Sequence, residues 1–373
     1  MTILFLSAEV SKRGSKATDR DMENNKLTGE EGKKGSKATD RDMENNKLIG
    51  EEGKKGSKAT DRDMENNKII AAEGVKWYEV KEQAAGHKRL MLLWYIYNIA
   101  GKNAVKFIVF FVTLFAFLWA PKIRKCSQKY LNIAAGKGTV FQSFRHFLNY
   151  SYGLVDKMEM FTDKFSFKNI SFADEDVKKM LYDDLLKKKG IYFLCSHLGN
   201  INAMRTFFRS GEVIDDIKVN LFLEANQCKI FKDFINKISS DNPITAYPVE
   251  NIDVTTSIEL KDKLDDGEIL FIAGDRVSAH NKDAVFKHNF LGHNVSFPLG
   301  AFKFALILGA PVYFIVCTAE KGGKYKIHLK KFEFEGRRKE KLQQLEKQYV
   351  EFLEDLTKKY PLQFYHFYDF FNI

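Results

Sequence analysis

The sequence predicts an α/β protein, a sandwich of helices around a mostly parallel sheet, preceded by N-terminal membrane-associated helices. Two patterns lead to this prediction. From residue 140 onward, short apolar runs alternate with longer amphipathic segments, as in proteins built around a parallel sheet. Before them, the stretch 107–120 is uncharged and rich in aromatic side chains. We therefore expect tandem repeats over residues 1–75, a membrane-associated helical region over 76–135 and an α/β domain over 136–373.

The first part of the chain consists of near-identical repeats. Residues 14–34 recur almost unchanged at 35–55, and a truncated third copy fills 56–68. Each full unit balances basic against acidic residues, and its large apolar side chains are one Met and one Leu, with Ile49 added in the second copy. This is too little apolar surface to offset the entropy lost on ordering. We expect residues 1–75 to be disordered or to arise from a misplaced start site. A repeat-based adhesion or scaffold arm is the functional alternative.

The next part, in which order is expected to begin near Trp77, carries an apolar stretch from 90 to 120 that only Lys102 and Lys106 interrupt. Its uncharged portion, 107–120, ends at Pro121 and would span about 21 Å as a helix, short of the roughly 30 Å of a bilayer core. We therefore expect a helix lying in one leaflet rather than crossing, with a buried soluble helix as the alternative. Cationic residues on both sides favour an anionic leaflet. They are His87, Lys88 and Arg89 before the stretch, and Lys122, Arg124, Lys125 and Lys129 after it.

The α/β domain is predicted from its alternation of strands and helices. The expected strands are 190–195, 218–224, 268–273, 311–317 and 324–330. The expected helices are 200–210, 253–266, 298–308 and 341–358. The last of these would present one apolar face, formed by Leu342, Leu345, Tyr349, Phe352, Leu353 and Leu356.

Composition narrows the class of protein. Nearly all of the net charge of +10, and every Phe except Phe5, lies after the repeats. A basic, aromatic-rich domain suits an anionic membrane surface or an anionic carrier. No basic stripe with stacking aromatics or recognition motif predicts nucleic-acid binding. The four cysteines are scattered and predict neither disulfides nor a zinc site, so we expect a reducing compartment and no metal.

The principal candidate for chemistry is His197, which follows an apolar run in the segment 191–202. Ligands of open α/β sheets bind at the carboxyl ends of strands, and an imidazole can remove and return a hydroxyl proton. The alternative is a core histidine bonded to a backbone carbonyl. Ser196, its neighbour on a strand, is expected to point to the opposite face.

Four further segments stand out. Asp275 and Arg276 directly follow an expected strand, where they could form only a salt bridge, or where Arg276 could hold a phosphate while Asp275 orients a histidine. The segment 290–300 predicts a turn leading into Phe297-Pro298 at a helix start, where free N–H groups favour an anion. Segment 308–316 is typical of a helix end followed by a buried strand. Segment 365–371 is an aromatic tail, forming either a core lid or a lipid-facing surface.

Together these segments resemble the lysophospholipid acyltransferase superfamily, in particular the bacterial branch of lipid A late acyltransferases and their predicted relatives. The resemblance runs from about Trp77 to the C-terminus. It follows five blocks in order: Ser-His-Leu-Gly, Gly-Asp-Arg, Phe-Leu-Gly with Phe-Pro-Leu-Gly, Gly-Ala-Pro-Val, and Phe-Tyr-Asp-Phe.

The resemblance implies acyl transfer from acyl carrier protein or acyl-CoA to a hydroxyl of a membrane lipid or glycolipid, without a metal or other cofactor, at the cytoplasmic face of a bacterial inner membrane. His197 matches the base of the family's histidine–acid motif, but Asn202 stands where the acid is expected. An amide can accept the imidazole hydrogen bond but supplies no charge. We therefore expect Asp275 or, as the weaker alternative, Glu224 to supply it.

The remaining roles follow from the same resemblance. Backbone N–H groups near Gly199 and Asn200, at the start of the next helix, would stabilise an oxyanion. Arg276 would hold the donor's phosphopantetheine or the acceptor's phosphate, and the turn at Phe297 and Pro298 would shape the acceptor pocket. Two alternatives stay open: a catalytically silent lipid-binding protein, which Asn202 favours, and a His-dependent hydrolase, for which the Gly-x-Ser-x-Gly motif is missing.

Overall fold

The computed structural model describes residues 87–161, 164–211, 217–225, 228, 244–277 and 283–372. The predictions made for the repeats in residues 1–75, and for the start of order near Trp77, lie outside these residues.

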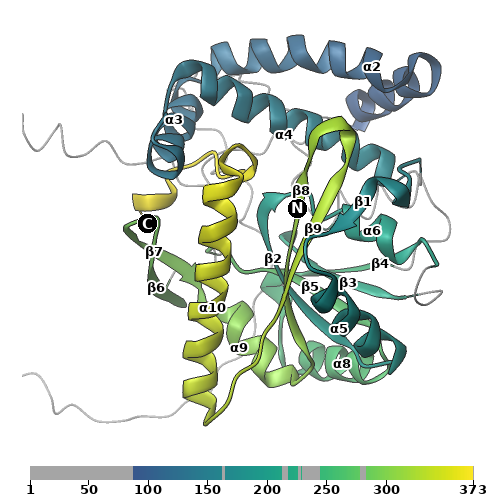
Figure 1. The fold of residues 1–373 in the computed structure, drawn as a ribbon, viewed down its shortest axis with the longest axis vertical. Helices are drawn as coiled ribbons and strands as arrows, with labels where there is room; N and C mark the ends of the chain where they lie inside the picture. Colours follow the sequence, from purple (N-terminus) through teal and green to yellow (C-terminus); the bar gives the residue numbers. More distant parts are fainter. Residues whose placement is uncertain are drawn as a thin grey trace, which may run out of the picture. The chain divides into compact units, whose positions relative to one another are not determined.

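A seven-stranded sheet forms the centre of the described part, in the order β1-β9-β8-β2-β5-β3-β4 (Figure 1). Its strands are β1 (Ile170–Phe172), β2 (Ile191–Gly199), β3 (Val219–Leu223), β4 (Ile244–Pro248), β5 (Ile269–Ala273), β8 (Val312–Ala319) and β9 (Tyr325–Lys331). Every neighbouring pair is parallel except β8 and β9. The predicted mostly parallel α/β sheet is therefore confirmed.

The five predicted strands correspond to β2, β3, β5, β8 and β9, whereas β1 and β4 were not predicted. Both lie at the edges of the sheet, and β1 has only three residues, too few to show an alternating pattern. The antiparallel step from β8 to β9 follows from its short connection, in which the Glu320 N–H donates to the Lys324 carbonyl at 2.8 Å. A parallel crossover would need a dozen or more residues.

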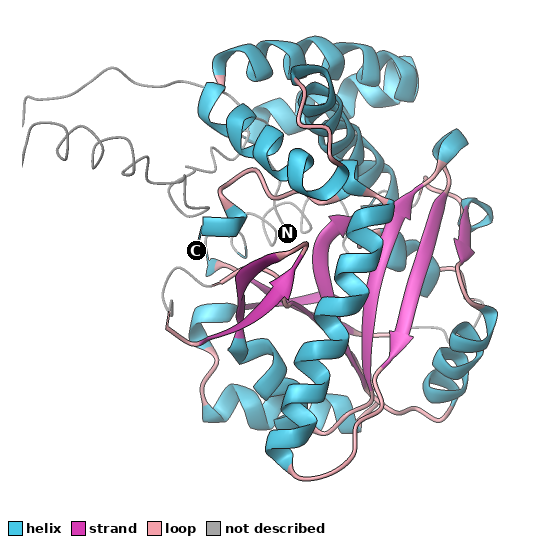
Figure 2. Ribbon diagram, turned by 60° about the vertical axis from the view of Figure 1, so that its left-hand side comes forward, coloured by secondary structure: helices cyan, strands magenta, loops and turns pink. Residues whose placement is uncertain are grey.

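Helices cover both faces of the sheet (Figure 2). On one face lie α8 (Val254–Asp265), α9 (Leu299–Leu308) and α10 (Arg338–Lys359), and on the other lie α5 (Glu175–Leu186) and α6 (Ala203–Phe208). Side chains of the central strand β2 alternate between the two cores: Tyr192 and Leu194 enter the first, and Ile191 and Phe193 the second. This two-sided burial explains why β2 reads as a continuous apolar run.

The apolar face predicted for the last helix is confirmed in α10. Leu345, Tyr349, Leu353 and Leu356 are buried against the sheet. Tyr349 also reaches the sheet backbone, where its hydroxyl donates to the Cys195 carbonyl at 3.0 Å.

A two-stranded antiparallel hairpin, β6 (Val285–Phe290) and β7 (His293–Pro298), occupies the segment for which we predicted a turn leading into a helix. The predicted glycine-bearing turn is found at Leu291 and Gly292, both with positive φ, and α9 starts after Pro298 as expected. The two strands that this turn joins were not predicted.

Three N-terminal helices pack beside the sheet: α2 (His87–Trp119), α3 (Pro121–Ala135) and α4 (Val140–Phe161). Helix α2 is kinked at Gly101, where φ is 76°. Its inner side packs on α4 through Val105 and Val109. Lys102, which interrupts the apolar stretch in the sequence, pairs with Asp156 of α4 at 2.9 Å. Lys102 therefore lies on the face of α2 that packs against the rest of the protein.

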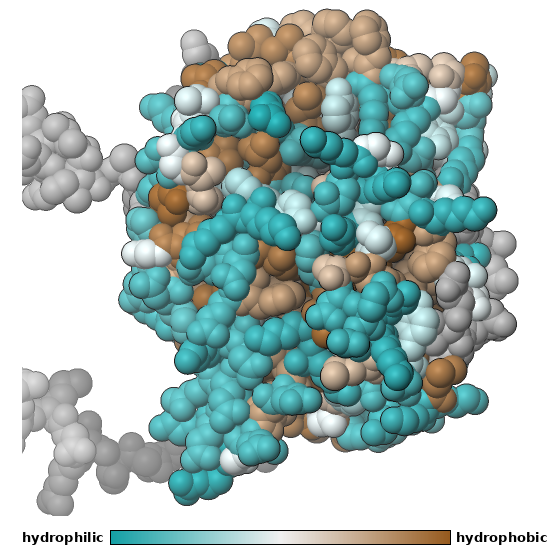
Figure 3. Space-filling model, in the orientation of Figure 1, coloured by the Kyte–Doolittle hydropathy of each residue, from teal (hydrophilic) through white to brown (hydrophobic). Residues whose placement is uncertain are grey.

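The outer side of α2 is apolar and exposed, and Figure 3 shows it as a hydrophobic surface at the top of the view. The large exposed side chains of this outer face are Tyr95, Ile99, Phe107, Phe111, Val112, Phe115, Leu118 and Trp119. One stretch among the described helices, Trp94–Trp119, is long and apolar enough to cross a membrane by length and composition, which is weak support for membrane contact. This helical stretch has 26 residues. It is therefore longer than the uncharged portion 107–120, whose length predicted a helix too short to cross a bilayer.

Candidate active site

His197 lies near the carboxyl end of β2, between the neighbouring strands β8 and β5. The pairing of β2 with β8 is irregular between Cys195 and Gly199. Gly199 has a φ of 74°, and a Cβ there would lie 2.1 Å from the Cys317 carbonyl oxygen. Only glycine allows this close approach, which turns the chain at the edge of the sheet directly after His197.

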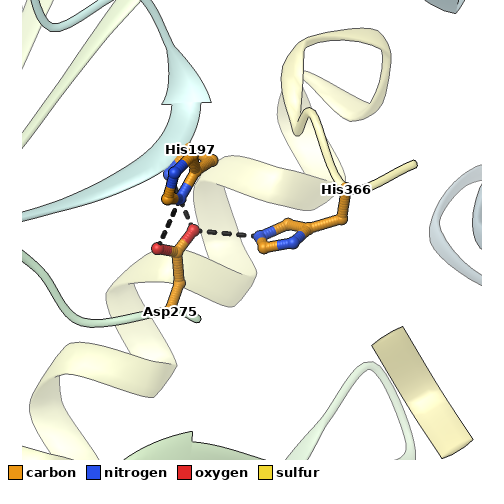
Figure 4. Close-up of side chains that lie close together, drawn as sticks. All are labelled: His197, Asp275 and His366. Carbon is orange, nitrogen blue, oxygen red and sulfur yellow. Dashed lines mark hydrogen bonds and ion pairs between the residues drawn. The ribbon is translucent and has the colours of Figure 1, made fainter. Parts of the chain in front are cut away.

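Asp275 follows β5, the strand next to β2, and its side chain is fully buried beside His197 (Figure 4). The His197 Nδ1 lies 2.8 Å from Asp275 Oδ1, and the His197 backbone N–H donates to Asp275 Oδ2 at 2.7 Å. The preceding Gly274 N–H donates to the Cys195 carbonyl at 3.0 Å and holds the two strand ends together. The expected placement of Asp275 at His197 is therefore found.

A third side chain, His366, completes this group from the C-terminal tail (Figure 4). Its Nε2 lies 3.0 Å from Asp275 Oδ2, and the residue is completely buried. The aromatic pattern of segment 365–371 did not distinguish His366, which was therefore not predicted as a site residue. The available signal was a single polar, titratable residue inside an otherwise aromatic segment, but no sequence spacing links it to β2 or β5.

Electrostatics favours an anionic Asp275 between two neutral imidazoles. Burial would raise the pKa of Asp275, but the adjacent His197 and the hydrogen bonds from both histidines hold it well below its usual value. Burial, followed by the charge of Arg276, lowers the pKa of His197 to about 3. Burial also lowers the pKa of His366 to about 4.

These charge states determine which nitrogen carries each proton. An ionised carboxylate only accepts hydrogen bonds, so His197 must donate from Nδ1 and His366 from Nε2. His197 then presents an unprotonated Nε2, the form that a general base requires. Its side chain keeps 18% of its surface exposed, in contrast to the fully buried Asp275 and His366.

His197 also borders a cavity of about 250 Å³ on the α6 side of the sheet. Its walls are mainly apolar, with side chains from α4, α6, β3 and β5. The apolar lining includes Phe161, Met204, Phe208, Leu221, Leu223 and Phe271, and the polar lining includes Ser196, Asn202, Arg205 and Arg209. Ser196 and His197 both border this space, and the pairing of β2 with β8 is irregular at this point. The expectation that their side chains face opposite sides stays a prediction.

Asn202, at the position where the resemblance expects an acid, is bonded elsewhere. Its Nδ2 donates to Asn200 Oδ1 at 2.6 Å, and the Asn200 side chain in turn donates to the Gly153 carbonyl at 3.1 Å. The Asn200 backbone N–H donates to the Cys317 carbonyl at 2.7 Å. The expectation that Asn200 offers a free backbone N–H for an oxyanion at a helix start is therefore wrong, and α6 itself begins only at Ala203.

Arg276 is partly engaged by the protein itself. Its Nη2 donates to the Tyr365 carbonyl at 3.0 Å, and its guanidinium lies 5.9 Å from the centre of the Tyr368 ring. It therefore binds the C-terminal tail across the site. Glu224 follows β3, which β5 separates from β2, so of the two carboxylates expected at His197 only Asp275 comes from an adjacent strand.

Phe297 and Pro298 end β7 and do not form a turn. Phe297 is completely buried and stacks on Phe286, with ring centres 5.5 Å apart. The N–H that follows Pro298 donates to the Ala284 carbonyl at 2.9 Å. Neither residue lines the cavity beside His197, and the Phe297 side chain belongs to the core. Their role in shaping an acceptor pocket stays a prediction.

Within the described residues, His197, Asp275 and His366 are also the group that could hold a metal ion, with their ligand atoms within 4.8 Å of one another. Each histidine nitrogen that would bind a metal lies at hydrogen-bond distance from the carboxylate. A bound metal would have to replace both of these hydrogen bonds. The absence of a metal therefore stays a prediction.

Comparison with known proteins adds no family assignment. No protein-family model matches the chain, and a search of curated proteins gives no significant match. The resemblance to acyltransferases therefore rests on the five sequence blocks.

Proposed function

We propose that this chain is a membrane-associated O-acyltransferase. It would move a fatty acyl group from a thioester of acyl carrier protein or coenzyme A to a hydroxyl of a membrane lipid or glycolipid. The observation that carries the proposal is the position of His197, whose Nδ1 is held by a buried carboxylate and whose side chain borders an apolar cavity. A base beside an apolar cavity suits a reaction between a hydroxyl and a fatty acyl group.

The proposed reaction uses His197 twice. Its Nε2 takes the proton of the acceptor hydroxyl as the oxygen attacks the thioester carbonyl. The tetrahedral intermediate then collapses, the carbon–sulfur bond breaks, and the thiolate leaves with the proton returned by His197. Asp275 stabilises the imidazolium that exists between the two steps and supplies the charge that Asn202 lacks.

The cavity fits the acyl part of the donor. Its walls at Phe208, Leu221 and Phe271 offer apolar surface to a hydrocarbon chain. Arg205 and Arg209 are its charged lining residues. Positive charge there suits a donor that carries phosphate or an acidic protein surface, and both proposed donors do.

The outer face of α2 supports membrane association. Exposed aromatic side chains such as Phe107 and Phe115 lie opposite the face that packs on α4. Exposed Lys122 and Lys125 follow directly in α3, where they would meet anionic headgroups. Because Lys102 ties the inner face to Asp156, we propose that α2 lies in one leaflet, on the cytoplasmic side of a bacterial inner membrane.

The test uses purified full-length protein in mild detergent with acyl carrier protein or coenzyme A thioesters and membrane lipids as acceptors. Thiol release and the mass of the lipid product are measured together. His197→Asn is the matched variant, since its amide can still donate to Asp275 but has no base at the Nε2 position. We expect a product heavier by one acyl group with the wild type and none with the variant.

Other outcomes would change the assignment. Thioester hydrolysis without a lipid product would favour the hydrolase alternative. Binding of acyl lipids without either reaction would favour the silent lipid-binding protein. In cells, deletion of the gene should leave a lipid species lighter by one acyl group, which lipid mass spectrometry would detect.

A further inference from the structure

The C-terminal tail is built into the candidate active site by backbone contacts. Phe364 forms an antiparallel bridge with Leu198, one residue after His197. The Tyr365 N–H donates to the His197 carbonyl at 3.0 Å. The Tyr365 carbonyl in turn accepts from Arg276 Nη2 at 3.0 Å. The tail therefore contacts the backbone at His197 on one side and Arg276, the residue after Asp275, on the other.

A second set of contacts fixes the tail from the helical side. The Phe364 carbonyl lies 3.0 Å from His146 Nε2 in α4, and His146 is completely buried. The ring of His366 packs between Phe364 and Phe370, with ring centres 4.1 and 4.5 Å away. These contacts leave the His366 ring little freedom, so its Nε2 is directed at Asp275 before any substrate binds.

The geometry points to His366 as a positioning residue for the His197–Asp275 pair, an inference that rests on the proposed function for its kinetic test. Asp275 Oδ2 is held by two donors, the His197 backbone N–H at 2.7 Å and His366 Nε2 at 3.0 Å. Oδ1 is then the oxygen that faces His197 Nδ1, at 2.8 Å. By limiting rotation of the carboxylate plane, His366 keeps Oδ1 against His197 Nδ1. The His197 proton is held on Nδ1 only while this hydrogen bond is made, and Nε2 is then free to act as the base.

Three substitutions of His366 test this role: one keeps a hydrogen-bond donor to Asp275 Oδ2, and two remove it. His366→Gln places an amide nitrogen where the imidazole Nε2 was, whereas His366→Leu and His366→Phe remove the donor and keep an apolar side chain among the aromatic rings. His328→Leu is the matched control, because His328 is also buried but bonds Thr318, outside this group. Thermal unfolding shows which variants are folded. Two donor-lacking variants are made so that the test still stands if one of them does not fold.

Activity is measured as kcat and KM separately. We expect both donor-lacking variants to lose about 10- to 100-fold in kcat with little change in KM, because His366 does not line the cavity. His366→Gln should recover most of this loss, and His328→Leu should match the wild type. A folded donor-lacking variant with wild-type kcat would overturn the inference.

A second readout does not depend on activity, and therefore separates failure of this inference from failure of the proposed function. Nitrogen-15 shifts of the His197 ring report which nitrogen carries the proton. We expect a proton on Nδ1 in the wild type and His366→Gln, and a mixture of the two forms in His366→Leu and His366→Phe. An unchanged Nδ1 proton in the donor-lacking variants would overturn the role of His366. So would a stoichiometric metal that binds the wild type and is lost in both of these variants, since it would make the group a metal site.

Discussion

Replacing Asp275 by asparagine tests the central pair of the candidate site. Asparagine keeps the shape of aspartate but turns one acceptor oxygen into an amide donor. The remaining oxygen is best placed at the Oδ2 position, where the His197 backbone N–H and His366 Nε2 both donate, at 2.7 and 3.0 Å. The amide NH₂ then faces His197 Nδ1, which must accept, so the imidazole proton moves to Nε2. His197 would be left in the wrong form to remove a proton.

The size of the effect follows from this change of form. In the serine-protease triad, the equivalent aspartate-to-asparagine change lowers kcat by about four orders of magnitude, and we expect a loss of about 10⁴ here as well. The remaining hydrogen bonds lose the assistance of the charge, which we expect to cost about 2 kcal/mol of unfolding free energy. The folded protein should therefore survive the substitution with almost no turnover.

The assay combines thioester turnover with chemical denaturation of the same preparation. Asp266→Asn, at an exposed position at the end of α8, is the matched control and should change neither quantity. Asn202→Asp restores the acid expected from the resemblance but removes the donor to Asn200 Oδ1; we expect no gain in rate. Wild-type turnover by folded Asp275→Asn would refute the assignment of Asp275 as the partner of the base.

Three further outcomes are expected. Burial lowers the pKa of His146 to about 3 and of His366 to about 4, so the unfolded chain binds more protons than the folded one below about pH 6.5. Each histidine should therefore lower the free energy of unfolding by about 2 kcal/mol between pH 7 and pH 5. Urea unfolding at the two pH values would measure this change, and equal stability at both would contradict the prediction. Gly199→Ala should cost more than about 3 kcal/mol, because a Cβ there meets a carbonyl oxygen at 2.1 Å and φ is positive; calorimetry showing a wild-type melting temperature would disprove the close approach. Phe107→Ser with Phe115→Ser should weaken co-sedimentation with anionic vesicles by about tenfold without lowering the melting temperature, whereas unchanged sedimentation would argue against this face as the membrane contact.

Local patterns were sufficient for much of the fold. The apolar run before His197 predicted a central strand because its side chains enter cores on both faces of the sheet. The apolar spacing in residues 341–358 predicted α10 because every fourth or third side chain meets the sheet. The edge strand β1 was not predicted because it has only three residues. The edge strand β4 pairs with one neighbour only and has no continuous apolar run, since its residues are Ile-Thr-Ala-Tyr-Pro.

Two residues assigned to the site make tertiary contacts that the local pattern did not predict. Phe297 is buried in the core, where it stacks on Phe286. Arg276 donates from Nη2 to the tail carbonyl of Tyr365, and its binding of a phosphate stays a prediction. Neither contact leaves a signal in the local sequence, since both partners are distant along the chain.

The sequence by itself determined that an imidazole stands at the end of a buried strand and that a carboxylate follows another strand, because strand periodicity and strand ends are local properties of the chain. Only the tertiary structure decided that these two strands are neighbours and that His366, 91 residues after Asp275, closes the group. The order of strands and the docking of the tail depend on how two cores pack around one sheet, and that packing is a property of the whole chain rather than of any segment.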